Sequence, residues 1–63
     1  MVEYFVNKDL GKKAMLIFWD ADTIKVTIGM FDTKFFKTYD KARKYLTDKR
    51  FTETNGLEFR RMK

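Results

Sequence analysis

The sequence has no cysteine, no histidine and no proline among its 63 residues. Without cysteine the chain cannot form a disulfide, and without cysteine or histidine it lacks the ordinary ligands of a zinc site. The same absences remove the Ser-His and Cys-His pairs that activate most protein nucleophiles. We therefore expect a protein that is not an enzyme and that uses no cofactor, no metal and no small-molecule substrate.

Asp20, Asp22 and Asp32 are the remaining candidates for a metal site, because three carboxylates can hold Mg²⁺ or Ca²⁺. The segment Asp20-Ala21-Asp22 lacks the further ligands and the glycine of a calcium loop. Aspartate is also a preferred turn residue. These residues therefore predict turns and not a metal centre.

Long apolar runs are missing as well. The longest, Ala14 to Trp19, is far shorter than the roughly 20 residues that a membrane-spanning helix needs. Met1-Val2-Glu3-Tyr4 does not begin a secretory signal, since no basic segment followed by an apolar stretch appears. We expect no membrane association and a cytoplasmic location.

What the sequence does have is a high content of residues that can form a core. Apolar residues make up 44% of the chain and aromatic residues 17%, which exceeds what disordered chains carry. A chain of this length buries only about 60% of its unfolded surface, and large rings fill such a small core efficiently. We expect residues 1–63 to form a single small domain.

The net charge of +5 is unevenly distributed. Residues 1–33 contain four basic and five acidic side chains, whereas residues 34–63 contain ten basic and four acidic ones. A basic half of this kind points to polyanionic partners, commonly nucleic acid. Ordinary surface charge that keeps the protein soluble is an equally weighted alternative.

Alternating apolar and polar residues predict β-strands with one buried face. Strands are predicted over residues 2–6, 13–19, 24–30 and 35–37, with turns at 7–11, 20–22 and 32–34. Residues 13–19 are apolar on both faces and indicate a central strand.

A helix is predicted from Tyr39 to Arg50, with Thr38 as its N-cap and Phe51 as an anchor after it. Asn55-Gly56 is a strong hairpin signal. It can either join residues 51–54 to residues 57–60 or bring a final strand, Leu57 to Met62, back to the sheet. We favour the final strand.

These elements predict an α+β fold: an antiparallel sheet of four to five strands with one helix, at about 39–50, packed on one face. The order is β-β-β-(β)-α-β. A helix of this length is about 18 Å long and covers only one side of the sheet. Because a monomer of this size seldom exposes a broad apolar patch to water, we expect a partner or a second copy of the chain to cover part of the other side. The alternative is that the chain curls or a terminal segment folds over it.

The sequence leaves the composition of that second side partly open. If Ile24, Val26 and Ile28 face the helix together with Val2, Tyr4 and Val6, then Phe5, Lys25, Thr27 and Phe31 lie on the far side. One apolar set of the central strand joins them. That set is either Met15, Ile17 and Trp19 or Ala14, Leu16 and Phe18.

The leading functional hypothesis is a small basic module that binds nucleic acid on the open sheet face. Exposed rings stack on bases while lysine and arginine neutralise phosphates. The predicted basic contacts are Lys25, Lys34, Lys37, Arg43, Arg50, Arg60 and Arg61. The predicted stacking or interface residues are Phe5, Met15, Ile17, Trp19 and Phe31.

Two other interpretations remain beside it. Binding of duplex DNA by the helix is less favoured, since Asp40, Lys44 and Asp48 form a ladder of opposite charges on its exposed stripe. A protein-interaction module, either a homodimer or an inhibitor of a larger protein, is the alternative function, because interface centres favour the aromatic, methionine and arginine residues found here.

Overall fold

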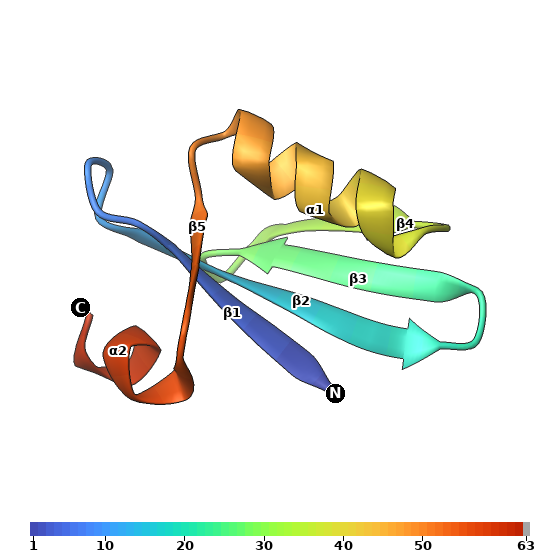
Figure 1. Ribbon diagram of the computed structural model, residues 1–63, viewed down its shortest axis with the longest axis horizontal. Helices are drawn as coiled ribbons and strands as arrows, with labels where there is room; N and C mark the ends of the chain where they lie inside the picture. The colour runs from blue at the N-terminus through green and yellow to red at the C-terminus, as the bar shows by residue number, and fades with distance from the viewer. Residues whose placement is uncertain (63) are drawn as a thin grey trace.

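The computed structural model describes residues 1–62 as a five-stranded antiparallel sheet with one helix on each side. The strand order across the sheet is β4-β3-β2-β1-β5. The elements are β1 (Val2–Asn7), β2 (Lys12–Asp20), β3 (Thr23–Ile28), β4 (Asp32–Phe36), α1 (Tyr39–Asp48), β5 (Thr52–Thr54) and α2 (Gly56–Arg61). In Figure 1, α1 lies above the sheet and α2 lies below it. The α+β prediction is confirmed.

The α1 side of the sheet holds the core. Cross-strand pairing places Leu16 between Glu3 of β1 and Val26 of β3, so these side chains share one face. Helix α1 completes the core with Ala42 and Leu46, which are fully buried. The core members are Phe5, Ala14, Leu16, Ile24, Val26, Ile28, Ala42, Leu46 and Phe51.

Helix α1 begins where its sequence predicts. The hydroxyl of Thr38 accepts a hydrogen bond from the backbone N–H of Lys41 at 3.2 Å, and Asp40 lies in the first turn. The helix ends at Asp48, two residues earlier than predicted, because Arg50 adopts a left-handed backbone with φ of 66°. Phe51 then enters the core, as predicted.

The predicted final strand is wrong. Residues 52–54 pair with β1 as the short edge strand β5, and residues 56–61 form helix α2. The side chain of Asn55 accepts a hydrogen bond from the backbone N–H of Glu58 at 2.8 Å, so Asn55 caps a helix instead of entering a hairpin turn.

The turn before β4 also lies earlier than predicted. Residues 29–31 make this turn, with Gly29 at a φ of 66°, and Asp32 already pairs with Ile28. Strand β4 therefore includes Asp32, Thr33 and Lys34. Neither helix within residues 1–62 has the length and apolar character needed to cross a bilayer.

Candidate functional site

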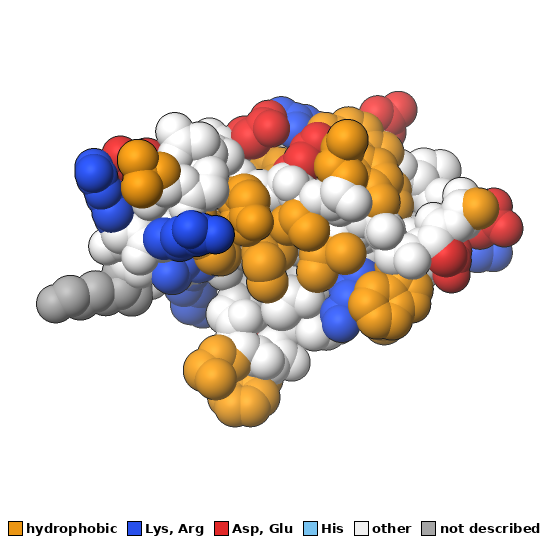
Figure 2. All heavy atoms as spheres, turned by 90° about the horizontal axis from the view of Figure 1, so that it is seen from below, with side chains coloured by type: hydrophobic (Ala, Val, Ile, Leu, Met, Phe, Trp, Pro, Cys, Tyr) orange, Lys and Arg blue, Asp and Glu red, His pale blue; other side chains and the backbone are white. Residues whose placement is uncertain are grey.

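The side of the sheet opposite α1 is only partly covered. Helix α2 lies on it at the β1 end, where the ring of Phe59 is 4.8 Å from that of Tyr4. Beyond α2 the face stays accessible, and Figure 2 shows hydrophobic side chains gathered across it with basic side chains beside them. We call this accessible part the open face. Its apolar and charged residues are Val2, Met15, Ile17, Trp19, Lys25 and Phe35.

One transverse row carries most of the open face. The pairing registers place Val2 opposite Ile17, Ile17 opposite Lys25, and Lys25 opposite Phe35. A single line of side chains thus crosses four strands, and its only charge is a lysine. The structure resolves the alternative left open for the central strand: Met15, Ile17 and Trp19 lie on this face, while Ala14 and Leu16 lie in the core.

Trp19 projects from the open face beside this row. The pairing of β2 with β3 shifts between Phe18 and Asp20, so Trp19 lies in a bulge. Its side chain is 58% exposed, and the ammonium group of Lys25 lies 4.6 Å from its ring centre. This distance allows a cation–π interaction, which holds the indole over the sheet.

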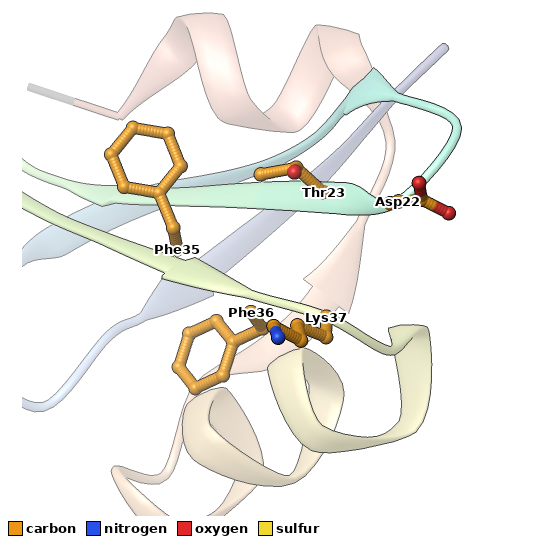
Figure 3. Close-up of a pocket in the computed structure, with 5 residues that line it drawn as sticks. All are labelled: Asp22, Thr23, Phe35, Phe36 and Lys37. Atoms are coloured by element: carbon orange, nitrogen blue, oxygen red, sulfur yellow. The ribbon is translucent and has the colours of Figure 1, made fainter.

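Phe35 belongs to the open face, although it was not among the predicted site residues. Phe35 and the following Phe36 point to opposite sides of β4 (Figure 3), and Phe36 packs near Tyr45 of α1. Phe35 remains 59% exposed. The sequence did carry a signal for Phe35. Successive side chains of a strand point to opposite faces, so two adjacent phenylalanines cannot both enter a core that lies on one side of the sheet.

A hollow of about 490 Å³ adjoins Phe35 at the sheet margin. It is lined by Asp22, Thr23, Phe35, Phe36 and Lys37 (Figure 3). Lys37 lines this hollow and thus lies at the rim of the open face.

Charged residues of both signs lie on both sides of the sheet, but in different proportions. Glu3, Asp32 and Glu53 occupy register positions on the α1 side, whereas Lys13 and Lys25 lie on the side of the open face. Lys13 contacts the ring of Phe59 at 4.8 Å. Arg60 and Arg61 are exposed on α2, which lies on this same side. The open face is therefore flanked by these cations, and Asp20, which pairs with Thr23, and Glu58 of α2 are carboxylates on the same side.

Phe5 does not lie on the open face, which corrects its assignment as a stacking residue. It is 1% exposed and belongs to the core under α1. The first strand has the opposite orientation from the one expected, so Glu3, Phe5 and Asn7 face α1. The polar neighbours of Phe5 find partners on that side: Glu3 binds Tyr39 and Arg43, and Asn7 binds the carbonyl of Lys49.

Arg43 is also not available as a free phosphate contact. Its guanidinium lies 3.3 Å from Glu3, 3.0 Å from Glu53 and 2.9 Å from the hydroxyl of Tyr39. The same hydroxyl donates to Glu3 at 2.8 Å. Hydrogen bonding to Tyr39 and Glu53 raises the pKa of Arg43 above its usual value, so its charge stays within this network.

The other predicted basic and aromatic residues are distributed around the molecule. Lys34 lies on the α1 side, with its ammonium group 5.2 Å from the ring of Tyr45. Arg50 is exposed after α1. Phe31 is 91% exposed in the turn before β4. Of the predicted set, the structure brings only Lys25, Met15, Ile17 and Trp19 together on one face, with Lys37 at its rim.

The three aspartates weighed as a cation site are separated. Asp20 and Asp22 belong to the turn between β2 and β3, while Asp32 pairs with Ile28 at the opposite end of β3. The side chain of Asp20 accepts a hydrogen bond from the N–H of Asp22 at 2.9 Å. These carboxylates serve the turns.

Comparison with known proteins adds no family to this description. The chain matches no family model, and neither the curated proteins nor the solved structures yield a match.

Proposed function

We propose that this protein is a non-enzymatic binding module that takes single-stranded nucleic acid on its open face. The observation that carries the proposal is the exposed pair Trp19 and Phe35 on either side of Lys25. Exposed rings offer bases a stacking surface, and base stacking contributes about 1–3 kcal/mol per base. A lysine between the rings supplies a positive charge for a phosphate.

The distribution of charge supports the same proposal. Lys13, Lys25, Arg60 and Arg61 lie on the side of the open face, and Lys37 lies at its rim. Glu3 and Glu53, whose carboxylates would repel phosphate, lie on the other side and are engaged by Arg43. A bound strand would therefore meet cations on this side of the sheet.

Fluorescence titration with a short single-stranded oligonucleotide tests the proposal, because Trp19 is the only tryptophan. We expect quenching, and an affinity that falls linearly with the logarithm of salt concentration. Phe35→Ala should weaken binding about ten-fold or more. Leu10→Ala is the matched control, because Leu10 is equally exposed but lies in the turn between β1 and β2. Unchanged fluorescence, or equal effects of the two substitutions, would contradict the proposal.

A protein partner is the second candidate, favoured by the apolar character of Val2, Met15 and Ile17 on the same face. Interface centres are depleted of charge and enriched in aromatic residues and methionine. Such a partner would blue-shift Trp19 emission with weak salt dependence, and the oligonucleotide would leave it unchanged. The two candidates therefore separate in one titration series.

A further inference from the structure

Strand β4 forms an open edge of the sheet. It pairs with β3 on one side, the sheet order ends with it, and Asp32 to Phe35 are all exposed. An edge strand presents unpaired backbone N–H and C=O groups, which can pair with another chain.

The hydrogen-bonding pattern identifies which residues present these groups. The N–H of Gly29 donates to the carbonyl of Lys13, which lies opposite it across the β2–β3 pair. Hydrogen-bonded and non-hydrogen-bonded pairs alternate along antiparallel strands. Odd-numbered residues of β3 therefore bond to β2 and even-numbered ones to β4. It follows that Asp32 and Lys34 bond to β3, while the N–H and C=O of Thr33 and Phe35 point outward from the sheet.

The sequence around this edge is complementary to itself when it is read in the antiparallel direction. If Thr33 faces Thr33 of a second copy, then Asp32 faces Lys34 and Phe31 faces Phe35, and each of these pairs occurs twice by symmetry. Opposite charges and paired aromatic rings are the cross-strand neighbours that stabilise antiparallel sheets. The outward-pointing Thr33 residues would exchange two backbone hydrogen bonds at the centre.

We propose that the chain forms a two-fold homodimer by antiparallel pairing of β4 with β4 of a second copy, centred on Thr33. This surface is the free edge of β4; it shares Phe35 with the open face but uses the backbone of β4, so the proposal does not depend on what the open face binds. The dimer explains why Phe31 and Phe35, at 91% and 59% exposed, flank the free edge. It also joins the two sheets into one, so that the two open faces become continuous.

Sedimentation equilibrium tests the proposal. We expect the wild-type mass to rise with concentration from 7.6 kDa towards twice that value. Asp32→Lys places lysine opposite lysine, and Lys34→Asp places aspartate opposite aspartate, so each variant alone should remain monomeric. A mixture of the two restores both opposite-charge pairs and should dimerise. The two variants carry net charges of +7 and +3, and the wild type carries +5. Because both variants are positively charged, their net charges repel and cannot cause the mixture to dimerise.

Two further variants separate this interface from others. Thr33→Pro removes an N–H that β3 does not use, so it should preserve the monomer fold, checked by circular dichroism, and abolish the dimer. Trp19→Ala alters the open face and should leave the dimer unchanged. A wild type that stays at 7.6 kDa, single charge variants that dimerise like the wild type, or a dimer that Trp19→Ala disrupts would each overturn the proposal.

Discussion

Arg43 of α1 and Glu53 of β5 form an ion pair in which Nη2 lies 3.0 Å from Oε1. The pair connects the helix to an edge strand of only three residues. Glu3 of β1 and the hydroxyl of Tyr39 bind the same guanidinium, so one side chain joins α1 to two adjacent strands.

We expect Arg43→Ala to lower the free energy of unfolding by about 1 kcal/mol. The ion pairs are half-exposed and each contributes little in water. The guanidinium also packs over the ring of Phe5, with its centre 5.4 Å away, so packing is lost with the charge. Urea denaturation measures the change. Lys44→Ala, which removes only the exposed pair with Asp48, should cost less than about 0.5 kcal/mol; equal costs would contradict the network.

Tyr39 should make the protein sensitive to alkaline pH. Its pKa is raised above the usual value of 10.0, first by burial and then by its hydrogen bond to Glu3, so folding favours the neutral phenol. A raised folded pKa contributes stability that is fully present below the unfolded pKa and is lost as pH rises through the folded pKa. We expect the wild type to lose stability above about pH 10. Thermal melts of wild type and Tyr39→Phe across this range measure it, and their stability difference should shrink as pH rises. A constant difference would contradict the assignment.

The side-chain amide of Asn7 should contribute to the stability of the fold. This buried side chain donates to the carbonyl of Lys49 at 3.0 Å and accepts from the N–H of Leu10 at 3.0 Å, so it joins the first turn to the end of α1. Asn7→Asp keeps the acceptor and places a carboxylate against a carbonyl. We expect a loss of about 1–3 kcal/mol at pH 7. The loss should diminish at acid pH, where the protonated carboxyl can donate, and a pH-independent loss would contradict this role.

The sequence predicted the parts of the fold that depend on local periodicity. Apolar alternation located β1 to β3, and Thr38 with Asp40 located the start of α1. These signals are strong because each acts within a few residues.

Two features could not be predicted from local periodicity: which face of β1 points to the core, and the secondary structure of residues 56–61. Val2, Tyr4 and Val6 looked like the core set, but β1 has an apolar residue on each face and tertiary partners decided its orientation. Asn55-Gly56 fits a hairpin turn, yet Asn55 followed by Glu58 three positions later is also a helix-capping pattern. Helix α2 covers part of the face that was expected to be bare, and this displaced the open face towards Trp19 and Phe35.

Replacing Arg50 with glycine should increase the stability of the protein. Arg50 occupies the position after the α1 C-cap, where its N–H donates to the carbonyl of Thr47 and that of Phe51 donates to Leu46. This is the Schellman arrangement, which usually has glycine at this left-handed position. Arg50 adopts a φ of 66° there, and a left-handed backbone costs a side chain-bearing residue about 1 kcal/mol.

Arg50→Gly should therefore raise the free energy of unfolding by roughly 0.5–1 kcal/mol, less than the full strain because glycine also frees the unfolded chain. Arg50→Ala is the matched control, since it removes the same charge and keeps the strain, and it should leave stability nearly unchanged. Urea denaturation of the three proteins gives both differences. A glycine variant no more stable than the alanine variant would show that the backbone at this position is not strained.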